Sequence, residues 1–134
     1  MLGHIMLGTN NLVKAGEFYD ALLAELGAAR NWEDSTFIVW GTEEDPLCFS
    51  ITKPYDGRRA TPGNGTMITF RAQSQEQVGR VHAKALLLGA LNEGAPGYRG
   101  PEEDGFYAGY FRDLDGNKLN VFHFTPPTRL GTAN

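Results

Sequence analysis

Three histidines, one cysteine and a few clustered carboxylates are the side chains of this chain that could do chemistry. His4, His82 and His123 lie far apart, and no G-x-S-x-G motif accompanies them, so we expect no Ser-His-Asp triad. Cys48 is the single cysteine, which allows no internal disulfide, and a free cysteine of this kind usually packs as a small apolar group. We expect the acidic run at 102–104 to be a solvated loop rather than a metal site.

Composition and charge limit the classes of partner that the protein can bind. The 134 residues include 12 Lys and Arg against 16 Asp and Glu, a formal net charge of −4, which argues against nucleic-acid binding. No apolar run approaches the roughly 18 residues of a membrane span. The first residues lack the basic start and long apolar stretch of a signal peptide. We therefore expect a single domain over 1–134, located in the cytoplasm and bound to neither membrane nor nucleic acid.

Apolar periodicity predicts the elements that position these residues. One stripe at helical spacing begins after Asn11 and ends at Gly27, and a second follows the S-x-x-Q capping box that opens at Ser74 and ends at Gly89. An alternating strand precedes each helix, and three strand-like runs follow it. The predicted strands are 3–8, 28–34, 36–40 and 47–52 in the first half, and 65–72, 90–94, 106–112 and 118–124 in the second.

The two halves of the chain repeat one unit, a βαβββ module. The first module spans about 3–53 and the second about 65–125, and the Pro- and Gly-rich loop 54–64 joins them. The fold class is therefore α+β, with one domain built from two modules.

Four segments carry a resemblance to a known superfamily. They are FYAGYFRDLDGNKLNVF at 106–122, GTMITFRAQS at 65–74, HIMLGTNNLVKAGEFYDALLAELG at 4–27 and the glycine-rich NEGAPGYRG at 92–100. In this order of elements the chain resembles the vicinal oxygen chelate superfamily, whose members include glyoxalase I, extradiol dioxygenases, fosfomycin-resistance enzymes and bleomycin-resistance proteins. The resemblance implies paired βαβββ modules whose strands curl into a cup-shaped mixed sheet with the helices outside. It also implies a homodimer.

The resemblance places the metal ligands of the superfamily on particular positions of this chain. His4 fits the first ligand, whereas Met67, Asn120 and Ser50 stand where metal-using members carry further ligands. A thioether, a neutral amide and a hydroxyl are poor donors for Zn, Ni, Mn or Fe(II). We therefore expect no metal cofactor, and a divalent metal is the less favoured alternative.

Strand alternation supports the same placement, because it turns these four positions toward the cup. Aromatic residues of the last hairpin add an apolar lining, which is typical of a small-molecule site. Arg99, in the glycine-rich loop, could hold an anionic group at the mouth. The predicted ligand-binding residues are His4, Ser50, Met67, Arg99, Tyr107, Asn120 and Phe122.

Three functions remain open from the sequence. The leading one is a glyoxalase/bleomycin-resistance/dioxygenase-like protein that binds a small aromatic molecule in the cup without the metal triad. The second is an atypical metal-dependent enzyme with lactoylglutathione-lyase-like or dioxygenase-like activity. The third is a non-catalytic homodimer with a vestigial cup.

Overall fold

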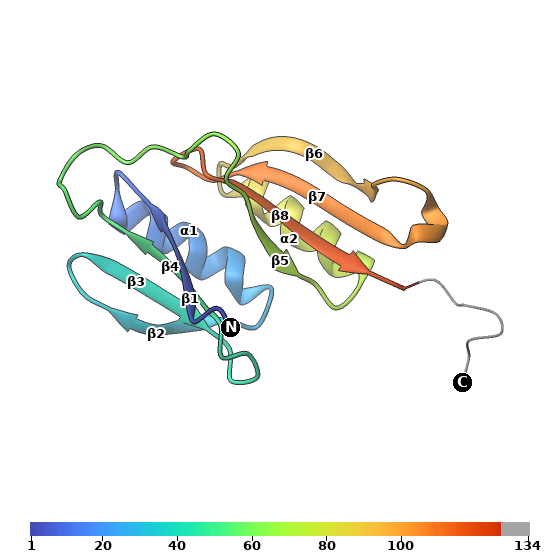
Figure 1. Cartoon of the computed structure of the whole chain (residues 1–134), viewed down its shortest axis with the longest axis horizontal. Coiled ribbons are helices and arrows are strands. Elements are labelled where there is room, and N and C mark those ends of the chain that lie inside the picture. The colour runs from blue at the N-terminus through green and yellow to red at the C-terminus, as the bar shows by residue number, and fades with distance from the viewer. Residues whose placement is uncertain (127–134) are drawn as a thin grey trace.

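The structure, a computed structural model that describes residues 1–126, consists of two βαβββ modules side by side (Figure 1). The first contains β1 (His4–Gly8), α1 (Leu12–Ala24), β2 (Ala29–Glu33), β3 (Phe37–Gly41) and β4 (Cys48–Thr52). The second contains β5 (Ile68–Arg71), α2 (Gln75–Leu87), β6 (Leu91–Tyr98), a short 3-10 turn η1 (Glu102–Asp104), β7 (Phe106–Arg112) and β8 (Lys118–Phe124).

Each module forms its own four-stranded sheet, and the two sheets have the same topology. The strand orders are β1-β4-β3-β2 and β5-β8-β7-β6. In both sheets the opening strand pairs in parallel with the last strand, and the other neighbours are antiparallel. The repeated α+β module predicted from the sequence is therefore confirmed.

Both helices begin at side-chain caps that the sequence predicts. The Asn11 side chain accepts a hydrogen bond from the Lys14 amide, and the Ser74 hydroxyl accepts one from the Gln77 amide. The helices contact each other and cover one side of the two sheets (Figure 1). None of the helices described within residues 1–126 is long and apolar enough to cross a membrane.

Two strand boundaries differ from the prediction by more than one residue, both in the second module. β5 begins only at Ile68, so Met67 belongs to the preceding loop. β6 continues to Tyr98 through a segment expected to be partly a loop, because Gly94 adopts a φ of 159° and the strand bulges against β7. Pro96 is tolerated there because β6 is an edge strand, where a missing N–H breaks no ladder.

The core fills the space between the sheets and the two helices. In the first module the rings of Tyr19, Trp40 and Phe49 pack together, with centroids 4.8 to 6.2 Å apart. In the second, α2 contributes Val78 and Val81, which are fully buried. Phe49 and Phe70 meet at 5.3 Å, so the cores of the two modules are continuous.

The D-L-D-G-N turn between β7 and β8 joins the two modules. Asp113 accepts hydrogen bonds from two backbone amides of its own turn and from the hydroxyl of Tyr19 in α1 at 2.5 Å. Asp115 accepts from the Thr9 hydroxyl at 2.6 Å and the Asn10 amide at 2.8 Å, both from the first module. Asn117 donates to the carbonyl of β1 residue 8. This turn therefore serves as the inter-module joint.

The joint also contains the buried titrating groups whose pKa values are displaced. Burial raises the pKa of Tyr19 well above its usual value, and the neighbouring charge and hydrogen bond of Asp113 raise it further. Burial also raises the pKa of Asp113, and the hydrogen bonds from Tyr19 and Asn117 oppose this shift without cancelling it. The hydrogen bonds around Tyr19 and Asp113 join the two modules. We therefore attribute the displaced pKa values of these two groups to a structural contact.

Candidate functional site

The side of the two sheets that points away from α1 and α2 presents the polar residues of the candidate site. We call this side the cup face. On the strands that flank the inter-module junction it carries alternate residues of each strand. These are His4 and Met6 from β1, Cys48 and Ser50 from β4, Thr69 and Arg71 from β5, and Lys118, Asn120 and Phe122 from β8.

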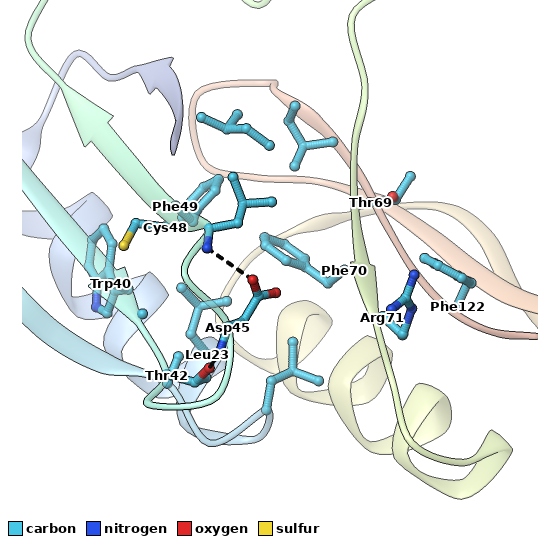
Figure 2. A pocket seen from close by; sticks show the side chains of 16 residues that line it. Leu23, Trp40, Thr42, Asp45, Cys48, Phe49, Thr69, Phe70, Arg71 and Phe122 are labelled. Carbon is cyan, nitrogen blue, oxygen red and sulfur yellow. Dashed lines mark hydrogen bonds between the residues drawn. The ribbon is translucent and has the colours of Figure 1, made fainter. Parts of the chain in front are cut away.

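A pocket of about 370 Å³ lies at the junction between the two modules. We call it the junction pocket. Figure 2 shows Phe49 and Phe70 next to each other in its wall, with Arg71 and Phe122 together beside β5. The remaining walls come from the end of α1, from β3 and from the loop between β3 and β4. They include Leu23, Leu26, Trp40, Thr42, Asp45, Leu47, Cys48, Ile68 and Thr69.

The pocket and the second sheet's cup face share residues, so they form one continuous site. Thr69, Arg71 and Phe122 line the pocket and also belong to the cup face. In the parallel ladder Thr69 pairs with Asn120 and Arg71 pairs with Phe122. Thr69 therefore connects the pocket with the position of Asn120, which does not itself line the pocket.

Asn120 is the buried polar group of this site. Its side chain is only 1% exposed, and its Oδ1 atom has no hydrogen-bond partner within residues 1–126. A buried acceptor without a donor destabilises the fold by about 1–3 kcal/mol. The Asn120 Oδ1 atom is therefore a candidate acceptor for a hydrogen bond from a ligand or a water molecule.

Cations and aromatic rings surround Asn120. Tyr110 pairs with Asn120 across β7 and β8, and the Arg99 guanidinium lies 5.2 Å and the Lys118 ammonium 5.8 Å from the centre of the Tyr110 ring. The Arg71 guanidinium lies 6.0 Å from the centre of the Phe122 ring, which stacks on Phe106 at 5.5 Å. Aromatic rings thus hold all three cations on the same face as the Asn120 amide.

The structure brings together several of the residues predicted from the sequence. Asn120, Phe122 and Arg99 lie on or over the cup face of the second sheet. Met67 is exposed in the loop just before β5, in a groove with Arg112 and Lys118. His4 is exposed on β1 and pairs with Cys48 of the junction pocket.

Two predicted residues do not offer a polar group to this site. Ser50 is fully buried, and its hydroxyl donates to the Ile5 carbonyl at 2.8 Å, so its polar group already serves the pairing of β1 with β4. Tyr107 packs against the core on the side of the helices, with its ring against Tyr98 at 5.3 Å. The ladder puts Tyr110 rather than Tyr107 on the face of Asn120.

Sequence reasoning missed the apolar walls of the junction pocket. Alternation assigns Ile5, Ile68 and Phe70 to the helix side, which is correct, yet these residues also line the gap between the modules. Whether these residues line the gap depends on how the two modules pack against each other, and no local pattern in the sequence predicts that packing. The one sequence signal for this pocket was an aromatic residue, Phe70, next to Arg71.

The donor set of the cup face does not fit the catalytic metal of the superfamily. His4 is the single imidazole among the four relevant positions, and the Ser50 hydroxyl is already committed to a backbone carbonyl. Within residues 1–126 no three His, Cys, Asp or Glu side chains cluster closely enough to hold a metal ion. A thioether and an amide do not replace an imidazole and a carboxylate around a hard or borderline ion.

Known structures share the fold of this chain, and the first one named below also shares more than a third of the aligned sequence. A glyoxalase/bleomycin resistance protein from Albidiferax ferrireducens is 37% identical, with a TM-score of 0.84 over 93% of this chain and 99% of that one. A glyoxalase/bleomycin resistance protein/dioxygenase family enzyme from Burkholderia phytofirmans is 16% identical, with a TM-score of 0.73 over 92% and 98%. The fosfomycin resistance protein FosX from Listeria monocytogenes is 22% identical, with a TM-score of 0.69 over 93% of each chain.

No protein-family model and no curated protein matches the sequence. The relation to the Albidiferax protein nevertheless extends over almost the whole of both chains at 37% identity, and it agrees with the repeated module and with the turn that joins its halves. The chain therefore belongs to the glyoxalase/bleomycin resistance protein family, within the vicinal oxygen chelate superfamily.

Proposed function

We propose that this protein binds a small, planar, aromatic molecule in the junction pocket, without a metal ion. The observation that carries the proposal is the lining of the pocket. Four aromatic residues, Trp40, Phe49, Phe70 and Phe122, surround about 370 Å³, a volume within the usual range for small-molecule sites. Planar ligands gain both apolar burial and ring stacking against such walls.

A small number of polar groups would orient the ligand. The Thr69 hydroxyl and the Arg71 guanidinium lie on the side of the cup face, and Asp45 lies in the loop on the other side. Next to them, the Asn120 Oδ1 atom lacks a donor. This distribution supports a molecule with an apolar ring system in the pocket and a polar end that reaches Asn120.

Binding in this mode is sequestration or transport of the ligand rather than metal-assisted catalysis. The metal-dependent enzyme alternative requires anionic or imidazole donors at positions that hold Met67, Asn120 and the committed Ser50 hydroxyl. The vestigial-cup alternative predicts a surface without a cavity, and the junction pocket argues against it.

Blocking the pocket tests the proposal. Thr69 is exposed and lines the pocket, so Thr69→Phe places a ring in the cavity without disturbing the core. Thr66 is also exposed and does not line the junction pocket, so Thr66→Phe is the matched control. We expect calorimetric titration with a naphthalene or quinoline derivative to show micromolar binding to the wild type and the control. Thr69→Phe should weaken it about tenfold or more. Unchanged binding by Thr69→Phe would refute the assignment of the pocket.

A further inference from the structure

The cup face of the second sheet has a charge that contrasts with the rest of the protein. The chain as a whole has a formal net charge of −4. Yet β5, β7, β8 and the residue that follows β6 place four cations on this face: Arg71, Arg99, Arg112 and Lys118. A local excess of one sign on a protein of opposite net charge indicates attraction of a ligand with the complementary charge.

One of the four cations is already neutralised inside the chain. Arg112 pairs with Glu93 at 2.6 Å and also donates to the carbonyl of residue 116. Within residues 1–126, no carboxylate lies within 4.0 Å of Arg71, Arg99 or Lys118. Three cations therefore remain available to a ligand on this face.

The three cations are held in place by contacts other than ion pairs. The Arg99 guanidinium donates to the carbonyls of Ala95 at 2.7 Å and Gly97 at 3.0 Å, and it lies over Tyr110. Lys118 shares the same ring, and Arg71 lies over Phe122. Because these contacts limit the side-chain freedom of the cations, a ligand would lose less conformational entropy when it binds them.

Asn120 lies at the centre of this arrangement. Lys118 and Phe122 are its same-face neighbours along β8, and Thr69 and Tyr110 flank it on the two adjacent strands. Its side chain is 1% exposed with an unpartnered Oδ1 atom, which is an observation independent of the charges. A ligand with a donor group next to its anionic group would satisfy both features at once.

From this convergence we infer that the ligand of the cup is a planar aromatic anion. Its ring lies in the junction pocket, and its carboxylate or phosphate group lies over Asn120 between Arg71, Arg99 and Lys118. A hydroxyl or N–H adjacent to the anionic group donates to Asn120 Oδ1. This inference rests on the proposed function and specifies the charge of the ligand, which the proposed function leaves open.

Two probes with the same ring and different charge test the inference. At pH 7, 2-naphthoate is an anion, and 2-naphthamide is its neutral isostere. We expect calorimetry to give an affinity about tenfold higher for 2-naphthoate at low ionic strength, because charge-assisted hydrogen bonds form only with the anion. About 0.5 M NaCl should reduce this difference and leave amide binding unchanged. An arm with 2-naphthyl phosphate shows whether the site prefers a phosphate over a carboxylate.

Charge-removing variants locate the anion. Lys118→Met and Arg71→Gln remove the charge and keep the first methylene groups of the side chain, and each should reduce the preference for the anion about 3- to 10-fold. Arg80→Met is the matched control, because Arg80 is an exposed cation on α2, away from the cup face. We expect Asn120→Leu to weaken the binding of 2-naphthamide, whose N–H can donate to Asn120 Oδ1, more than that of 2-naphthoate, which carries no donor.

The outcomes separate this inference from the proposed function. Equal affinity for naphthoate and naphthamide, blocked by Thr69→Phe, would overturn the inference and leave the proposed function standing. An anion preference that Lys118→Met, Arg71→Gln and Arg80→Met all reduce equally would also overturn it, because the effect would be one of overall charge. Failure of every probe to bind would refute both.

Discussion

The hydrogen bond between Tyr19 and Asp113 gives a direct measure of how strongly the two modules are joined. The Tyr19 hydroxyl is 2.5 Å from Asp113 Oδ2, and both side chains are buried. In Tyr19→Phe the ring remains to pack against Trp40 and Phe49, so the variant removes the hydrogen bond and little else. Asp113 then keeps the bonds from its own turn and loses the one that crosses to α1.

The expected loss follows from the charge of the acceptor. A hydrogen bond to an ionised group contributes about 1.5–3 kcal/mol, so we expect Tyr19→Phe to lower the free energy of unfolding by that amount at pH 7. In a chain of this size the change corresponds to a fall of about 5–10 °C in Tm. Urea unfolding followed by tryptophan fluorescence measures the change. Tyr55→Phe, at a fully exposed tyrosine, is the control and should leave stability unchanged.

The same variant has a predictable pH dependence. Because burial raises the pKa of Asp113 in the folded state, its contribution to stability is fully present below the ordinary value of 3.8 and is lost as the pH rises through the raised pKa. The Tyr19 hydrogen bond opposes this loss by stabilising the carboxylate. The penalty of Tyr19→Phe should therefore be larger at pH 7 than near pH 4. A penalty below about 0.5 kcal/mol at pH 7, or one that grows as the pH falls, would refute this reasoning.

Two further predictions concern metal and assembly. Protein purified without chelator should contain well below one equivalent of Ni, Zn, Mn or Fe by elemental analysis, whereas Met67→His combined with Asn120→Glu should raise Zn²⁺ affinity by providing a His-His-Glu set with His4. Stoichiometric, tightly held metal in the wild type would contradict the donor argument. We also expect a homodimer, because the edge strands β1 and β5 and exposed apolar side chains such as Met6 and Phe124 favour pairing. Light scattering should then give twice the mass of one chain, and the mass of a single chain at micromolar concentration would contradict it.

Much of the fold could be predicted because local signals agreed with one another. Caps at Asn11 and Ser74, helix stops at Gly27 and Gly89, and alternation in the strands repeat in the same order in both halves of the chain. The length of β6 was harder to predict, because glycines and a proline normally indicate a loop. In this edge strand they are accommodated by bulges that pairing with β7 stabilises.

The site was predictable only where alternation decides the face of a residue. Alternation correctly put Asn120 and Phe122 on the cup face, and it cannot show that the Ser50 hydroxyl is committed to the Ile5 carbonyl. Tyr107 was predicted from its position on the last hairpin. The pairing of β7 with β8 instead puts Tyr110 beside Asn120. The junction pocket depends on the packing of one module against the other, and this packing is set by long-range contacts such as that of Phe49 with Phe70.

A crystal structure of the protein with bound 2-naphthoate is the most direct test of the central claim, that the junction pocket is the ligand site. The account predicts ring density in the junction pocket, with the carboxylate over Asn120 and within hydrogen-bonding distance of at least one of Arg71, Arg99 and Lys118. Density for the ring outside the junction pocket, or a pocket filled by its own side chains while the ligand binds in solution, would contradict it.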